Sequence, residues 1–218
     1  MGHGVRIILD SLSISFPGRR ATCVVGPGGT GKSTLLGTLA NEGRVAPPLW
    51  ARGAVTIEGT VAACPQARPA PPTLADLLAA TLPGRATRDC VDAAWWAVPT
   101  ARDRLLRVAG ASLDRLPSDV RRLAEITPVL ASGADLLLLD EPDAGARAVT
   151  LDWTITQLVH TKADQTVVVA THHLGLAREV ADDVLLLLDG TVVEHAGVET
   201  FFERPASART AAFVVMGS

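Results

Sequence analysis

The sequence has no tyrosine, only 4% aromatic residues, and only two lysines, Lys32 and Lys162, among its 20 basic residues. Its formal net charge of −3 gives no indication of a nucleic-acid partner. The three cysteines are widely spaced and odd in number, which suits a reducing compartment and does not match a metal-ligand spacing. No apolar run approaches the length of a membrane span and no signal peptide is recognised, so we expect any membrane link to go through a partner.

The remaining composition is that of a globular protein. A length of 218 residues is enough for one domain with a substantial core. With 48% hydrophobic and 20% charged residues, the composition is globular rather than disordered. We therefore expect a single domain over residues 1–218.

A glycine-rich segment organises the rest of the chain. Cys23 to Thr34 reads CVVGPGGTGKST, in which an apolar strand precedes a turn and a helix start. Gly26, Gly31, Lys32 and Ser33 satisfy the phosphate-loop spacing G-x-x-x-x-G-K-[ST]. Such a loop aims backbone N–H groups at an anion, Lys32 would reach the β- and γ-phosphates, and the Ser33 hydroxyl would ligate Mg²⁺. The predicted phosphate-binding residues are Gly26, Pro27, Gly28, Gly29, Thr30, Gly31, Lys32, Ser33 and Thr34.

The apolar pattern predicts a mainly parallel sheet. Ala21 to Val25 precedes the loop, and three later runs are short and nearly continuous, as expected of strands covered on both faces: Leu136–Leu139, Val167–Ala170 and Val184–Leu188. Helical stretches near 148–162 and 173–181 separate these runs. The third run ends in Asp189-Gly190, which predicts a hairpin and an antiparallel edge.

Two further strand predictions depend on alternation alone. Leu12 to Phe16 alternates apolar and polar residues like a strand. Val55 and Ile57 precede Glu58-Gly59 and then Thr60 to Cys64, which predicts a second hairpin. Residues 73–130 have a helical, amphipathic pattern instead, and at least one of Trp95 and Trp96 should pack in a core while an exposed one would be free to contact a partner.

Acidic residues follow the Leu136–Leu139 run. Asp140 and Glu141 stand at the carboxyl end of a predicted strand, where open α/β sheets place their ligands. Asp140 would hold Mg²⁺ through its water shell, and Glu141 would polarise the attacking water as general base. Alternatively, the two acids only end a strand and begin a turn.

Two more residues are candidates for the same site. His172 follows the Val167–Ala170 run and would bond the γ-phosphate or the water, whereas His173 reads as a helix start. Gln66 follows Cys64 and Pro65, and its amide would touch Mg²⁺ and the water. Read alone, each would usually be an ordinary polar loop residue, but the position of His172 after this strand favours a functional role.

The ordered set of motifs in this chain resembles the nucleotide-binding subunit of ABC transporters. The motifs are, in order, GPGGTGKST, a lone glutamine after a strand, LLLLDEP, THH and VLLLLDGTVVEHAG. The resemblance extends from about Leu9 to Val214. It implies an α/β fold of the P-loop NTPase type, with a mainly parallel central sheet, an antiparallel edge and a helical subdomain inserted at about residues 73–130. The tail, Glu199 to Pro205 with Arg209-Thr210, is similar to importers, phosphate importers among them.

The resemblance also implies function. ATP with Mg²⁺ would be hydrolysed with Glu141, His172 and Gln66 as catalytic residues and with Ser33, Gln66 and Asp140 at the metal. The family pairs ATP-binding subunits head to tail as homo- or heterodimers, each ATP lying between one phosphate loop and the partner's signature loop. Transmembrane permease subunits are the further partners, which implies a peripheral location on the cytoplasmic face of the cell membrane.

Three departures from the family pattern stand out. Where the family has the signature LSGGQ, this chain reads Leu116-Pro-Ser-Asp119-Val, without its glycines. No aromatic residue stands where the family stacks adenine, and only His3 lies near that place. Arg147 replaces an aspartate that normally communicates across the dimer. Two such chains would form poor composite sites, so our hypothesis is a heterodimer with a partner whose signature loop is intact.

Two other functions stay open at this stage. A divergent nucleotide-binding regulator with little turnover would explain the lost glycines and the missing stacking residue. A soluble ABC ATPase in repair or translation usually carries insertions or paired cassettes, which this short chain lacks.

Overall fold

The computed structural model describes residues 7–43, 51–64 and 73–217. Its sheet has the strand order β2-β3-β4-β1-β5-β6. The strands are β1 (Ala21–Val25), β2 (Val61–Cys64), β3 (Leu136–Asp140), β4 (Thr166–Thr171), β5 (Asp183–Leu188) and β6 (Thr191–Gly197). Neighbours from β2 to β5 pair in parallel, whereas β6 pairs with β5 antiparallel after the Asp189-Gly190 turn. The predicted α/β fold with a mainly parallel sheet and an antiparallel edge is therefore confirmed.

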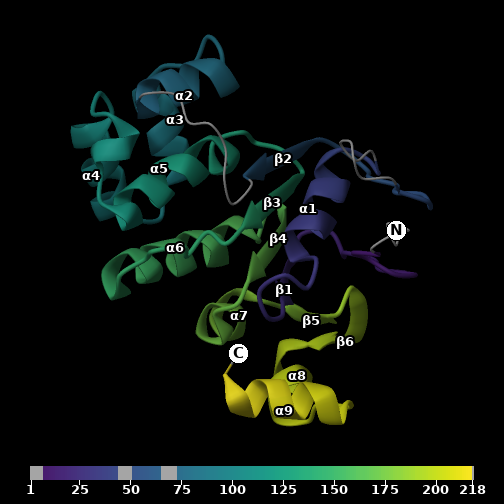
Figure 1. Cartoon of the computed structure of the whole chain (residues 1–218). Helices are drawn as coiled ribbons and strands as arrows, with labels where there is room; N and C mark the ends of the chain where they lie inside the picture. The colour runs from purple at the N-terminus through teal and green to yellow at the C-terminus, as the bar shows by residue number, and fades with distance from the viewer. Residues whose placement is uncertain (1–6, 44–50, 65–72, 218) are drawn as a thin grey trace, which may run out of the picture.

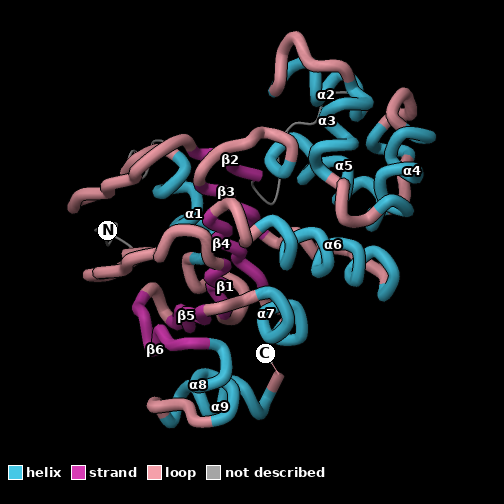
Figure 2. The backbone as a smooth tube through the Cα atoms, turned by 180° about the vertical axis from the view of Figure 1, so that it is seen from behind, coloured by secondary structure: helices cyan, strands magenta, loops and turns pink. Residues whose placement is uncertain are grey.

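Helices surround this sheet in Figures 1 and 2. They are α1 (Lys32–Ala40), α2 (Leu74–Thr81), α3 (Thr87–Ala94), α4 (Pro99–Val108), α5 (Ser118–Leu130), α6 (Ala148–Thr161), α7 (Leu174–Val180), α8 (Val198–Glu203) and α9 (Ala208–Met216), with a 3₁₀ turn at Leu113–Arg115. In both views α2, α3 and α4 lie at the β2 end of the molecule, and α8 and α9 lie at the β6 end.

Alternate residues of a strand point to opposite faces of the sheet. Both faces of this sheet are covered, so the apolar runs are buried on both sides. Cys23 of β1 and Leu139 of β3 belong to the larger core, which α5, α6 and α7 cover. Val24 and Leu138 belong to the smaller core on the other face, which α1 covers together with the chain around Leu9 to Phe16. This two-sided cover explains why the strands read as continuous apolar runs.

The segment predicted to be helical, residues 73–130, forms α2 to α5. Trp95 is fully buried there, and its indole Nε1 donates to Thr127 Oγ1 at 2.9 Å, whereas Trp96 is 58% exposed. One tryptophan of the pair therefore packs in the core, as predicted. Helix α5 contacts β2 and β3, so it connects these helices to the sheet. That the segment is an inserted subdomain of a single domain stays a prediction.

The strand predicted at Leu12 to Phe16 is wrong, because the described residues form no sheet ladder there. The alternation has another cause. Leu12, Ile14 and Phe16 are half-buried against the smaller core, while the serines between them are exposed. One-sided burial of an extended segment produces the same period as a half-buried strand.

The hairpin predicted at Val55 to Cys64 is also wrong. Only Val61–Cys64 is a strand, and it pairs in parallel with β3. The turn itself exists, since Gly59 has a φ of 96°. However, Asp135 holds it: the backbone N–H of Thr60 donates to Asp135 Oδ2 at 2.8 Å, and a Cβ on Gly59 would lie 2.5 Å from that oxygen. This long-range contact leads the chain alongside β3.

Candidate functional site

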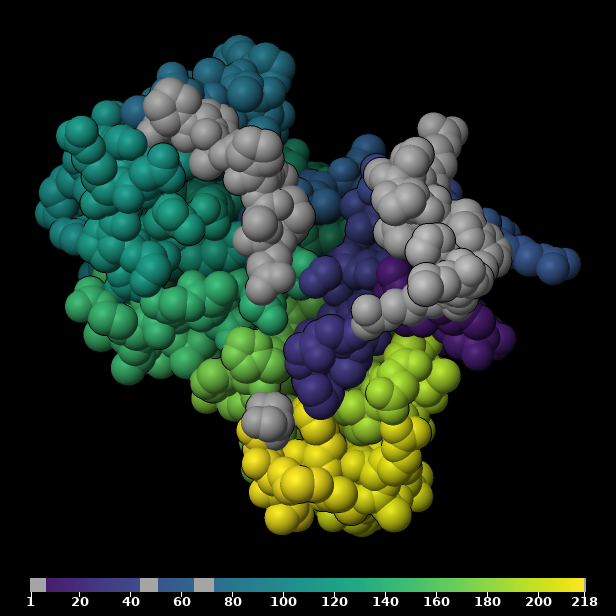
Figure 3. Space-filling view, viewed as in Figure 1, coloured from purple at the N-terminus to yellow at the C-terminus, as the bar shows by residue number. Residues whose placement is uncertain are grey.

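The phosphate loop spans residues 26–34, between the end of β1 and the first turn of α1. Gly26 has a φ of 152°, and a Cβ there would lie 2.2 Å from the carbonyl oxygen of Leu187. Gly31 has a φ of 102° and would bring a Cβ to 2.7 Å from the Leu9 side chain. Both positions require glycine for conformation and for space. In Figure 3 the dark-blue part of the chain that holds this loop is open to solvent.

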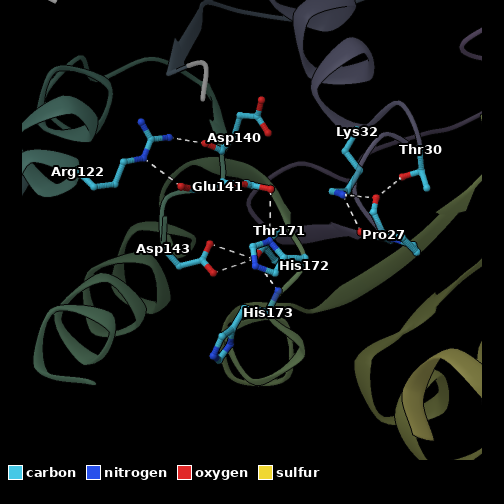
Figure 4. Close-up of polar contacts among 11 residues, drawn as sticks. Pro27, Thr30, Lys32, Arg122, Asp140, Glu141, Asp143, Thr171, His172 and His173 are labelled. Carbon is cyan, nitrogen blue, oxygen red and sulfur yellow. Dashed lines mark hydrogen bonds and ion pairs between the residues drawn. The ribbon is translucent and has the colours of Figure 1, made fainter. Parts of the chain in front are cut away.

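Lys32 is almost entirely buried under this loop. Its ammonium Nζ donates to the carbonyl oxygens of Gly26 at 2.6 Å and Pro27 at 2.9 Å (Figure 4). Burial lowers the pKa of Lys32 from its ordinary value of 10.5, while the carboxylates of Glu141 and Asp140 act in the opposite direction. The ammonium is therefore a desolvated cation close to two acids.

A cavity of about 440 Å³ lies against the loop. It is lined by Ile8, Gly28, Gly29, Gly31, Lys32, Ser33, Thr34 and Glu141. A Cβ on Gly28 or Gly29 would meet no atom within 4 Å, so the backbone is open on that side. The cavity thus brings the phosphate loop and an acid from a different strand to the same space.

That acid reaches the cavity because of the sheet order. Asp140 ends β3 in register with Ala170 of β4, and Thr171 of β4 lies beside Val25 of β1. The carboxyl ends of three parallel strands therefore meet at one edge, where such sheets bind ligands. Asp140 is buried, and Glu141 follows with a φ of 49°, in the left-handed region that few residues other than glycine adopt.

The two histidines after β4 have different surroundings. His172 Nδ1 lies 3.3 Å from Glu141 Oε1, and its side chain is 55% exposed. His173 is the N-cap of α7, where its Nδ1 accepts the backbone N–H of Leu176 at 2.9 Å, so its predicted place at a helix start is confirmed. The structure thus brings His172 to Glu141, while the catalytic roles of both stay predictions.

Arg122 is a residue of this site that sequence reasoning missed. It is 4% exposed, and its guanidinium reaches from α5 to the end of β3. Its Nε donates to the carbonyl oxygen of Glu141 at 3.0 Å, and its Nη2 donates to that of Asp140. The sequence signal was a charged residue on the apolar face of a predicted helix, and such a signal does not predict which group the charge will contact.

Two predicted residues lie outside the described part of the chain, namely Gln66 and His3. The structure therefore neither places the predicted glutamine at the metal nor tests the base contact. Ile8, which is described, lines the cavity.

The oxygen donors present suit Mg²⁺. No group of three or more His, Cys, Asp or Glu side chains within residues 7–43, 51–64 and 73–217 is arranged to hold a metal ion. A magnesium site does not need one, because Mg²⁺ keeps several waters and takes one or two protein ligands together with substrate phosphates. Ser33 in the cavity wall and Asp140 at the end of β3 offer a hydroxyl and a carboxylate of that kind.

A set of curated relatives agrees with this geometry. Over 237 residues the chain is 28% identical to "Phosphate import ATP-binding protein PstB 2" of Mycobacterium tuberculosis, which covers 98% of this chain and 85% of the relative. The Mycobacterium bovis protein of the same name matches equally well. The chain is thus similar over nearly its whole length to phosphate-import ATP-binding proteins. No protein-family model matches it.

Solved structures of ABC proteins share the fold. An ATP-binding subunit of an ABC transporter superposes with a TM-score of 0.74 at 20% identity, covering 96% of this chain and 92% of that one. The ATP-binding cassette MJ0796, solved as a dimer in a post-hydrolysis state with ADP and Pi, gives a TM-score of 0.74 at 19% identity, over 91% of this chain and 94% of that one. Among the described residues no helix combines the length and apolarity needed to cross a membrane.

Proposed function

We propose that this chain is the ATP-binding and ATP-hydrolysing subunit that powers a membrane ABC transporter of the importer type. One observation carries the proposal: Lys32 of the phosphate loop and Glu141 from the end of β3 line the same cavity. A cation for phosphate oxygens and a carboxylate for a water molecule are the parts that phosphoryl transfer to water needs.

Each residue then has a defined task. The backbone N–H groups of residues 28–33 and the ammonium of Lys32 bind the triphosphate, which replaces the loop carbonyls that Lys32 now contacts. Glu141 orients and deprotonates the attacking water, and His172, whose Nδ1 lies 3.3 Å from Glu141 Oε1, bonds the γ-phosphate or the water. Gln66 remains the proposed sensor of the bound nucleotide. Ser33 and Asp140 would hold Mg²⁺, which would supply positive charge to offset that of the phosphates.

The partners follow from the relatives. The curated relatives are named as phosphate-import ATP-binding proteins. We therefore assign the chain a peripheral place on the cytoplasmic face of the cell membrane, bound to transmembrane permease subunits. It pairs with a second ATP-binding subunit, in keeping with the dimeric MJ0796 structure. The transported solute is phosphate or another small solute, for which the relatives' names are the support.

The decisive experiment measures binding and turnover separately. Wild-type protein should bind ATP with magnesium and release phosphate. Lys32→Ala should lose binding, and Glu141→Gln should keep ATP bound without hydrolysing it, because an amide is not a base. Glu58→Gln, at an exposed acid that does not line the cavity, is the matched control. Wild-type protein that binds ATP but never releases phosphate would favour the nucleotide-binding regulator instead.

A second experiment tests the partners. ATPase activity is measured for the chain alone and with candidate partner subunits, and the complex is purified from membranes. A permease that co-purifies and activity that rises with a second, different subunit would support the heterodimer. Full activity of the chain alone would overturn the heterodimer, and purification without any membrane component would point to a soluble ABC ATPase.

A further inference from the structure

Arg122 connects helix α5 to the two acids of the site. Its side chain is 5% exposed, which is rare for a charged group unless several partners surround it. Two of its nitrogens donate to consecutive backbone carbonyls, those of Asp140 and Glu141. These bonds fix the backbone where the proposed metal ligand and the proposed base leave the sheet.

The guanidinium is itself held in place. Its Nη1 lies 3.0 Å from Glu125 Oε2, one turn further along α5, and 3.6 Å from the Sγ of Cys64 at the end of β2. Gln66 stands two residues after Cys64 in the sequence. Because the guanidinium is planar and rigid, a fixed Arg122 spans the ends of β2 and β3 at one geometry.

We propose that Arg122 is a positioning residue for ATP hydrolysis, which sets the backbone of Asp140 and Glu141 and thereby aims the Glu141 carboxylate at the cavity. The inference rests on the proposed function, in which Glu141 is the general base. The left-handed backbone of Glu141 supports it, since a conformation of this kind persists only where surrounding contacts determine it. The bonds from Arg122 and the backbone N–H bond of Glu141 to Ala170 O at 2.7 Å are such contacts.

The described contacts predict that binding and turnover separate. Lys32 and Thr30 bond to carbonyls within the phosphate loop, and none of these bonds involves α5. Removal of the Arg122 guanidinium should therefore leave ATP affinity intact and lower kcat. A displacement of about 1 Å at a reacting group lowers a rate by as much as about a hundredfold.

The test compares two neighbouring arginines of α5. Arg121 shares Glu125 as an ion-pair partner, at 3.3 Å from its Nε, but is 46% exposed, so Arg121→Met is the matched control. For Arg122→Met we expect kcat to fall by about tenfold to a hundredfold, with the Kd for ATP changed by less than about twofold. Arg122→Lys should recover part of kcat, because one ammonium cannot serve both carbonyls in the geometry of the fork. Arg121→Met should match the wild type.

Several results would overturn the inference. Arg122→Met with wild-type kcat would do so, and so would a parallel loss of ATP binding and turnover in the folded variant. If Arg122→Met does not fold, Arg122→Lys decides alone, and wild-type kcat in that variant contradicts the proposal. Failure of the proposed function has a different signature, namely a wild-type protein that binds ATP without hydrolysing it.

Discussion

Asp119 and Arg147 form an ion pair, with Arg147 Nε 2.8 Å from Asp119 Oδ2. Both residues are departures from the ABC pattern, one in the signature segment and one in the loop after Glu141, and the sequence presented them as unrelated. Asp119 lies in the first turn of α5 with its side chain 2% exposed, whereas the side chain of Arg147 is 77% exposed. The carboxylate thus meets the positive end of the helix and a cation from the neighbouring loop.

This pair should couple the two departures energetically. Asp119→Asn and Arg147→Gln are compared with the double variant by urea denaturation in a double-mutant cycle. We expect a coupling energy of about 0.5–1 kcal/mol, kept small because solvent screens the exposed arginine. The coupling should shrink in 1 M salt. Strict additivity of the two single effects at low salt would show that the contact contributes nothing.

Nucleotide binding should be linked to proton uptake through Lys32. Burial lowers its pKa in the nucleotide-free chain. Between that lowered pKa and the ordinary value the unfolded chain binds more protons, so stability rises with pH across this window. A bound triphosphate should raise the pKa again, so ATP binding at a pH between the lowered pKa and the ordinary value of 10.5 should take up protons.

Calorimetry in buffers of different ionisation enthalpy measures this uptake. Lys32→Arg is the control, because a guanidinium stays charged over the whole range. Whatever binding that variant retains should show no linked protonation from this position. Proton release on ATP binding by the wild type in that pH range would contradict the assignment.

The two adjacent tryptophans should differ in their effect on stability. Trp95→Phe removes the bond from its Nε1 to Thr127 and leaves unfilled volume in the core, at a cost of about 1–3 kcal/mol. Trp96→Phe, at a site 58% exposed, should change stability by less than about 0.5 kcal/mol. Urea denaturation of both variants checks this, and equal effects would mean that Trp96 also carries a packing role.

Acid should weaken the contact between β1 and the segment before β5. Burial tends to raise the pKa of Asp182, but the backbone N–H of Ala21 and the ammonium of Lys162 outweigh it and hold that pKa below 3.8. A carboxyl with a lowered pKa stabilises the fold above its unfolded pKa, and this contribution is lost as pH falls below about 4.

Asp182→Asn therefore should be less stable than the wild type at pH 7, and the difference should narrow as pH falls through about 4 towards the lowered pKa. Thermal unfolding from pH 7 to pH 2 measures it, with Asp189→Asn, an acid whose side chain is 89% exposed, as the control. A constant difference across that range would exclude the ionised carboxylate as the cause.

The sequence by itself determined the parts of this protein whose physics is local. Residues 21–25 form a strand with the predicted bounds, because an apolar run of that length buried on both faces has few alternatives. The phosphate loop could be predicted because its glycines, its lysine and the following helix occur within one short segment. The hairpin at Asp189-Gly190 could be predicted because its turn residues and its two strands are adjacent in the sequence.

Only the tertiary structure decided which distant residues meet. The alternation at Leu12 to Phe16 indicates one-sided burial but does not show whether a neighbouring strand is present. At the predicted second hairpin, a contact between Gly59 and Asp135 holds the turn instead. Arg122 bonds to Glu141, 19 residues later in the sequence, and Arg147 bonds to Asp119, 28 residues earlier. At such sequence separations, local patterns do not predict which residues meet. Local patterns constrain backbone conformation, whereas the partner of a buried charge depends on how the helices pack against the sheet.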